Sequence, residues 1–416
     1  MKFSSTNQKL TIAYLNTLTF SIVQILLYTT IPYISEKTSL HTATIIGAIS
    51  VGSFIFAFMG PFWATKSDTW GRKRVLSFGM LGMFFSFMLL CSLFLFNDQL
   101  SMTAKIVIMF SCRIIYGLLS SAVVPVSQAW QLDLIDTKDK LKVLTRNSMC
   151  LNVGRVLGPV LILIQKVDFE HMIYAGTLWV LMLALGCLLT SSPAEKKLSS
   201  EAAQKFDWKA IALEWKALFK ESMLPILLAL IFTSFIGVLH STLGHHLKET
   251  LNIKGDEASV QMAKLVLGSS IFALVVQQTS QWIFKRDWKL RLITGASALI
   301  LGSFVLNAAG TLNGIWGALM LISIGLALIP PVYMALISAS AKENVTGKKI
   351  GFASIAHSLG YAFGAGMIAL SMKMNLVSNM TVIGFISLVT FAIVASLIFN
   401  KTDFVLPAKK DAQLSS

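Results

Sequence analysis

Two arginines stand inside long apolar segments of this chain, where a positive charge is costly. Arg113 interrupts residues 106–132 and Arg155 interrupts residues 147–165. An arginine within a bilayer costs at least about 2.5 kcal/mol on insertion scales, so it normally faces an aqueous cavity or a partner. Guanidinium groups bind carboxylates and phosphates through paired N–H donors, a geometry that lysine does not supply. The pair therefore indicates a binding site for an anion.

The other polar side chains of these segments are neutral. No Asp or Glu falls within any long apolar segment, and Gln24, Tyr116 and Tyr361 are predicted to complete the binding site. Arg113 has an alternative role, because it could hydrogen-bond backbone carbonyls of the first segment without touching a ligand.

His357 is the predicted carrier of a coupling proton, together with Arg113. Histidine titrates near physiological pH, which suits a group that is charged on one side of a membrane and neutral on the other. A structural hydrogen bond is the alternative role for His357. No nucleophile, acid and base are grouped as an enzyme needs, and the four cysteines lack metal-ligand spacing. We expect no catalytic activity, no metal and no cofactor.

The elements that position these residues are transmembrane helices. Charged residues are only 13% of the chain and hydrophobic residues 55%, whereas soluble domains carry about 25% charged residues. A crossing needs about 20 apolar residues. The first six predicted spans are residues 10–35, 43–65, 75–97, 106–132, 147–165 and 172–194. The remaining six are 222–247, 265–284, two within 292–341 divided at 307–313, 350–372 and 374–400.

These spans predict an all-α integral membrane protein with twelve transmembrane helices in two six-helix bundles. The bundles are residues 1–194 and 222–416, joined by a cytoplasmic linker, 195–221. Apolar side chains recur at helical spacing near Trp208 to Phe219, so the linker is either an amphipathic helix on the inner leaflet or a simple tether.

The distribution of Lys and Arg predicts the orientation. If the amino terminus is cytoplasmic, 26 of the 35 basic residues lie on the inner side and 7 on the outer side. This bias places both termini in the cytoplasm, in a plasma membrane that we take to be a bacterial inner membrane. The net charge of +15 is then explained by an anionic inner leaflet, so no nucleic-acid partner is expected.

The connection between the second and third spans carries a specific pattern. It holds Gly60, Asp68, Gly71, Arg72 and, after Lys73, Arg74. This pattern resembles the signature loop of the major facilitator superfamily of secondary transporters. The resemblance implies a gate made by Asp68, Gly71, Arg72 and Arg74, with Asp133 as the partner acid. Alternatively, the basic residues only fix the topology.

Two further motifs carry the resemblance. Arg113-Ile114-Ile115-Tyr116-Gly117 is similar to the family's Arg-x-x-Gln-Gly element, with Tyr116 where Gln is usual. The second motif, resembling the Gly-x-x-x-Gly-Pro element of the family's antiporters, consists of Gly154, Gly158 and Pro159, and Gly360 and Gly364 repeat its spacing. Small residues four apart allow close helix packing. The repetition is expected if the halves are related by a pseudo-twofold axis.

The resemblance implies a proton-coupled transporter that works by alternating access, as a monomer. Exporters of cationic drugs in this superfamily usually hold an embedded carboxylate, so the arginines favour a small anionic cargo, of which a carboxylate siderophore is a specific example. Export is favoured over import. The alternatives are an organic-anion:proton symporter, a multidrug exporter, and a non-transporting receptor or scaffold.

Overall fold

The computed structural model describes residues 5–134, 140–164, 168–189, 213, 216, 222–284, 287–339, 346–374 and 379–399. The regular secondary structure of this part of the chain is helical. The predicted linker, with its amphipathic segment, lies almost wholly outside the described residues.

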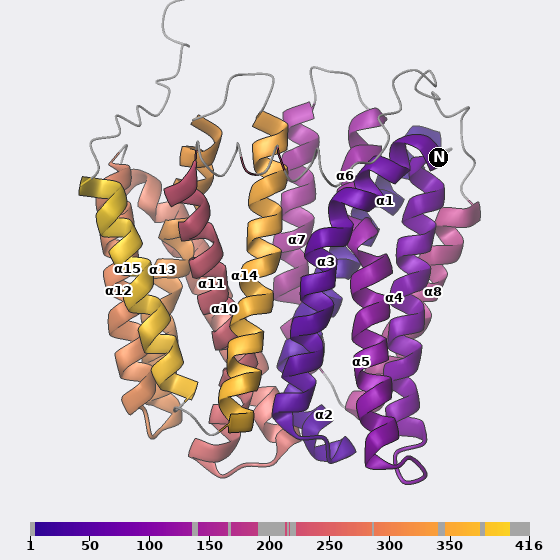
Figure 1. The fold of residues 1–416 in the computed structure, drawn as a ribbon, viewed down its shortest axis with the longest axis horizontal. Helices are drawn as coiled ribbons and strands as arrows, with labels where there is room; N and C mark the ends of the chain where they lie inside the picture. The colour runs from indigo at the N-terminus through magenta and orange to yellow at the C-terminus, as the bar shows by residue number, and fades with distance from the viewer. Residues whose placement is uncertain are drawn as a thin grey trace, which may run out of the picture.

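The first half of the chain forms a series of helices that run side by side (Figure 1). They are α1 (Ser5–Thr29), α2 (Ile31–Thr38), α3 (Thr42–Trp70), α4 (Arg72–Leu95), α5 (Met102–Leu119), the 3₁₀ turn η1 (Ser120–Ala122), α6 (Val123–Asp133), α7 (Lys140–Leu163) and α8 (Phe169–Leu189). The second half contributes α10 (Met223–Leu251), α11 (Gly255–Ile283), α12 (Trp288–Ala308), α13 (Leu312–Ala339), α14 (Thr346–Met374) and α15 (Asn379–Phe399).

Most of these helices have the length and composition of membrane spans. Among the described residues, 11 helical segments are long and apolar enough to cross a bilayer, and α7 contributes a shorter apolar stretch, Met149–Leu163. Large apolar side chains such as Leu178, Met182 and Phe385 are more than 60% exposed on the outer helices. Such a surface fits lipid rather than water. The all-helical, multi-pass membrane prediction is confirmed, and the count of twelve crossings remains a prediction.

Two predicted spans are not continuous helices. The first, predicted over residues 10–35, ends at Thr29, and α2 begins with Pro32 in its first turn. Proline suits a helix start because it lacks a backbone donor. The fourth, predicted over 106–132, is interrupted by η1, which ends three residues before Pro125. The missing N–H of Pro125 favours a local tightening of the helix at this point.

The connection between the second and third predicted spans, with its signature pattern over residues 60–74, is almost entirely helical. Helix α3 continues through Pro61 to Trp70, and α4 starts at Arg72. Only Gly71 separates them, with φ 92°, a conformation that favours glycine. The charged residues that ended the apolar segments did not end the helices, because charged side chains are well solvated at a membrane surface. The predicted break at 307–313 does separate α12 from α13.

The halves of the chain lie on opposite sides of a central contact (Figure 1). Helix α3 packs against α14, and α7 packs against α11. Within the first half, Gly154 and Gly158 let α7 approach α1, since a Cβ at Gly158 would lie 2.1 Å from the Cγ2 of Ile25. Within the second half, Gly360 and Gly364 let α14 approach α10, since a Cβ at Gly364 would lie 2.2 Å from the oxygen of Ser234.

Candidate substrate and gating sites

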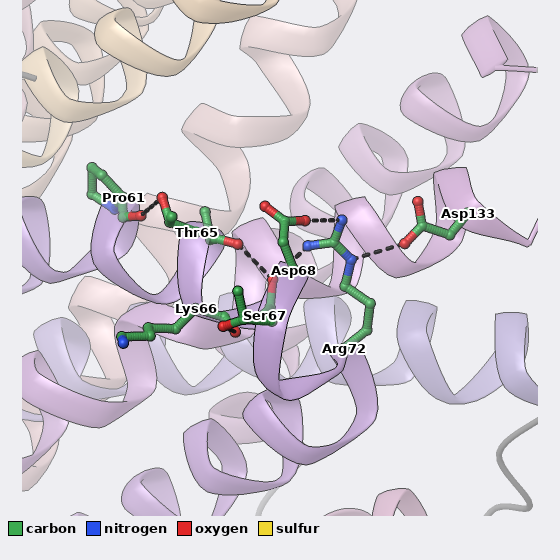
Figure 2. Close-up of polar contacts among 9 residues, drawn as sticks. Pro61, Thr65, Lys66, Ser67, Asp68, Arg72 and Asp133 are labelled. Carbon is green, nitrogen blue, oxygen red and sulfur yellow. Dashed lines mark hydrogen bonds and ion pairs between the residues drawn. The ribbon is translucent and has the colours of Figure 1, made fainter. Parts of the chain in front are cut away.

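A cluster of charges links α3, α4 and α6 at the end of the molecule that carries the amino terminus (Figures 1 and 2). Arg72 lies at its centre, with Nη2 2.5 Å from Asp68 and Nε 2.8 Å from Asp133. Its Nη1 donates to the hydroxyl of Ser67. Asp68 stands in the last turn of α3, where the helix dipole disfavours an acid. Arg72 compensates for this by pairing with it.

The other residues of the predicted gate are placed differently. Gly71 supplies the connection between α3 and α4, whereas Arg74 is exposed. In the second half, Asp287 caps α12 by accepting a hydrogen bond from the N–H of Leu290 at 2.9 Å. Three of the five predicted gating side chains are therefore in direct contact.

Arg113 is buried in α5 and is held by an aromatic ring. Its Cζ lies 4.3 Å from the centroid of the Tyr116 ring, one turn further along the helix. Tyr116 in turn stacks on Phe20 and Phe56, with centroid separations of 6.3 and 6.0 Å. Helix α3 comes very close here, because a Cβ at Gly52 would lie 2.6 Å from the carbonyl oxygen of Arg113. Arg113 thus lies where α3 packs closely on α5, with its guanidinium over the Tyr116 ring.

A second aromatic group joins the two halves. Tyr28 of α1 lies 5.7 Å from the ring of His240 and 6.3 Å from that of Tyr361, between centroids. His240 and Tyr361 are 6.2 Å apart. Nearby on α14, His357 meets the ring of Tyr333 edge-on at 5.4 Å. Its Nε2 is buried and has no hydrogen-bond partner in the described structure.

Arg155 and Gln24 are the exposed members of the predicted substrate site. Arg155 belongs to α7 and Arg113 to α5, so the two charged side chains come from different helices of the first half. Gln24 lies one helical turn from Phe20 and from Tyr28, on the face of α1 that carries both aromatic groups.

The opposite end of the molecule is closed by contacts between the halves, which we call the α2 latch (Figure 1). Glu36 of α2 lies 2.5 Å from the Nζ of Lys248 on α10, and it also accepts from the backbone N–H of Gly255 at 2.8 Å. The backbone N–H of Tyr33 donates to the hydroxyl of Ser259. Gly255 is required for this fit, since a Cβ there would lie 2.6 Å from the oxygen of Pro32.

A separate ion pair ties α2 to its own half. Lys37 lies 2.7 Å from Glu170 of α8. The two ion pairs shift the pKa values of Glu36 and Lys37 in opposite directions. The hydrogen bond from Lys248 holds the pKa of the Glu36 carboxyl below its usual value, whereas the hydrogen bond to Glu170 raises the pKa of Lys37. Both groups are therefore charged at neutral pH.

Sequence reasoning missed Phe20, Phe56 and the α2 latch. The spacing of Phe20, Gln24 and Tyr28, four residues apart, could have indicated one functional face of α1. Opposite charges at the outer ends of the first and seventh predicted spans, Glu36 and Lys248, could have suggested the latch. Among the described residues, no group of three or more His, Cys, Asp or Glu could hold a metal ion.

These sites occur in a chain whose family is established by its sequence. Residues 13–365 match the profile of the Major Facilitator Superfamily, and the chain belongs to this family. It is therefore a multi-pass membrane transporter rather than an enzyme. The quinolone resistance protein NorA of Staphylococcus aureus (strain Mu50 / ATCC 700699) is 24% identical over 318 residues, which cover 74% of each protein.

Solved transporter structures share the fold over nearly the full chain. A mutant of the nucleoside transporter NupG aligns with a TM-score of 0.72 at 15% identity, covering 94% of this chain and 98% of that one. The D-xylose-proton symporter aligns with a TM-score of 0.70 at 16% identity, covering 97% and 98%. The human organic anion transporter MFSD10 (TETRAN) aligns with a TM-score of 0.61 at 16% identity, covering 94% and 99%. At these identities the likeness concerns the fold.

Proposed function

We propose that this protein is a proton-coupled secondary active transporter that exports a small anionic organic molecule, such as a carboxylate siderophore. The observation that carries the proposal is the charge of the central site. Arg113 and Arg155 lie within the spans, and in the described spans no acid stands near them. A cation without a partner in a membrane requires a compensating charge. An anionic cargo supplies it.

The binding site contains Arg113, Arg155, Gln24, Tyr116 and Tyr361. Arg155 and Gln24 are exposed, while the tilted rings of Tyr28 and Tyr361 lie 6.3 Å apart across the boundary between the halves. A cargo bound here touches both halves, as alternating access requires. This arrangement supports a site that changes its accessibility when the halves move.

His357 carries the coupling proton in this proposal, and Arg113 senses it through the bound cargo. His357 is half-buried and its Nε2 is free to accept a proton. A protonated His357 and Arg155 would carry like charges, which repel each other. Binding of an anion would neutralise the charge of Arg155, so cargo and proton would influence each other's binding.

The α2 latch and the Asp68–Arg72–Asp133 cluster act as gates at opposite membrane faces. We assign the cluster to the cytoplasmic face of a bacterial inner membrane, with both termini on that side, because of the excess of Lys and Arg there. Residues 1–194 and 222–416 then move as two six-helix bundles related by a pseudo-twofold axis, in a protein that works as a monomer. The glycine pairs on α7 and α14 keep each bundle rigid.

A binding experiment tests the sign of the cargo. Purified protein in nanodiscs is titrated with citrate, salicylate and tetraphenylphosphonium. Arg113→Gln and Arg155→Gln should each abolish binding of the carboxylates, and Lys at either position should rescue poorly. Arg146→Gln, which removes an exposed charge from the same helix as Arg155, is the matched control. Tight binding of the cation that both variants retain would show the assignment to be wrong.

Multidrug export is the second candidate function, favoured by the similarity to NorA. Proteoliposomes with an imposed pH gradient separate the remaining alternatives. Movement of an anion in the direction opposite to the proton flow supports antiport. Movement in the same direction as the protons supports a symporter. A protein that binds anions but moves none under any gradient would be a receptor or scaffold.

A further inference from the structure

Tyr116 occupies the motif position where glutamine is usual in the family, and its ring is rigidly held. Phe20 and Phe56 stack on it with interplanar angles of 16° and 21°. The side chain is 4% exposed. A glutamine at this position would offer a carbonyl oxygen to Arg113. Tyrosine offers a ring face instead.

The ring holds Arg113 without using its hydrogen-bond donors. The guanidinium carbon lies 4.3 Å from the ring centroid, within the range of a cation–π contact. Such a contact acts on the face of the guanidinium and leaves the N–H groups at its edge. Among the described residues, nothing accepts a hydrogen bond from the buried Nε of Arg113.

The hydroxyl of Tyr116, like the Nε of Arg113, is buried and lacks a hydrogen-bond partner in the described part of the chain. Two buried donors on one turn of α5 are thus unsatisfied. Leaving a buried donor unpaired costs about 1–3 kcal/mol, and more for a charged group. Buried polar groups in proteins are nearly always paired, so an acceptor is expected at this point.

We propose that Tyr116 determines the specificity of this site for oxyanions: its ring positions Arg113, and its hydroxyl donates with the Nε of Arg113 to one carboxylate or phosphate group of the cargo. This inference rests on the anionic cargo proposed above. Two donors on one turn of α5 suit the two oxygens of a single carboxylate. The corresponding amide is a poor ligand, because its NH₂ group meets a donor.

Three substitutions at one position separate the two functions of the side chain. Tyr116→Phe keeps the ring and removes the hydroxyl. Tyr116→Leu removes both. Tyr116→Gln introduces the usual residue of the motif, whose side-chain carbonyl can accept a hydrogen bond from the Nε of Arg113. Each variant is compared with the wild type for melting temperature, so that a folding defect is recognised separately from a binding defect.

The probes are matched acids and amides: salicylate with salicylamide, and benzoate with benzamide. Binding to the full chain in nanodiscs is measured by calorimetry. Tyr116→Phe should weaken the acids about tenfold, as for loss of one hydrogen bond to a charged group, and leave the amides unchanged. Tyr116→Leu and Tyr116→Gln should weaken binding of the acids further. In Tyr116→Leu the guanidinium of Arg113 loses the ring that positions it, and in Tyr116→Gln its Nε is hydrogen-bonded to the glutamine.

The outcomes distinguish this inference from the proposed function. If the wild type and Tyr116→Phe bind the acids equally while Arg113→Gln does not bind them, the anionic site stands and the role of the Tyr116 hydroxyl is refuted. If Tyr116→Phe weakens acid and amide alike, the hydroxyl acts only in packing, which also refutes it. If the wild type binds none of the acids but binds cations, the proposed function fails, and this inference fails with it.

Discussion

Removing the charge of Glu36 should open the α2 latch. Glu36→Gln keeps the size of the side chain and an acceptor for the N–H of Gly255, but it loses the ion pair with Lys248. The side chains of Glu36 and Lys248 are 42% and 38% exposed, so the pair contributes only about 0.2–1 kcal/mol. The charge also stabilises the first turn of α11 by about 0.3–1 kcal/mol. Because 1.4 kcal/mol is a factor of about ten, the ratio of closed to open molecules should fall by between about twofold and thirtyfold.

The assay is the distribution of distances between spin labels on the outer ends of the two halves. Thr103 on α5 and Asn313 on α13 are exposed there and are suitable labelling sites once the four native cysteines have been replaced. The longer distance should gain population in Glu36→Gln. Lys37→Gln is the matched control, since it breaks an ion pair of the same helix whose partner, Glu170, lies in the same half.

The pH dependence has a definite sign. The pKa of Glu36 is lowered in the closed state by Lys248, so the latch gains stability from the charge above the usual carboxyl pKa of 4.5 and loses it only as the pH falls through the lowered value. The distance distribution of the wild type should thus be constant from neutral pH to about pH 5 and open below about 4.5. An identical distribution in wild type and Glu36→Gln at neutral pH would refute the reasoning.

The remaining predictions concern the inner gate, helix packing and topology. Asp68→Asn should leave expression intact but slow transport strongly, and Asp133→Asn should do the same. The effects of the two substitutions on the transport rate should be non-additive in the double variant, because both residues pair with Arg72. Unchanged turnover in proteoliposomes would show that the cluster only fixes the topology. Gly360→Ala places a Cβ 1.9 Å from the Oγ1 of Thr233 and should lower the melting temperature by an amount corresponding to about 1–3 kcal/mol, whereas Gly384→Ala, with open space around it, should not. A single cysteine at Ser200 should react with an impermeant reagent only from the cytoplasm and one at Thr103 only from outside; reversed accessibility would contradict the orientation.

Much of the fold could be predicted from the sequence because a bilayer imposes a simple requirement. Every backbone polar group must be paired within its own helix, so long apolar segments identify the spans almost directly. The details depended on single residues instead. Pro32 and Pro125 divided two predicted spans, and Gly71 alone made the connection between the second and third spans, which had been predicted over residues 66–74.

Less of the candidate site could be predicted from the sequence. Arg113 and Arg155 were evident because charge is rare in a membrane. Their surroundings were not, since Phe20 and Phe56 are ordinary residues in an apolar helix until the packing of α1 and α3 brings them to Tyr116. Glu36 and Lys248 are 212 positions apart in the chain. Only the tertiary fold makes them neighbours.

The position of the α2 latch has a practical consequence for inhibition. Glu36 and Lys248 remain partly exposed at the face that we assign to the outside. An antibody fragment or cyclic peptide that spans α2 and the start of α11 could hold the halves together there without entering the cell. Such a molecule would act on the conformational cycle rather than compete with the cargo. Its potency would therefore not fall as the cytoplasmic concentration of the cargo rises.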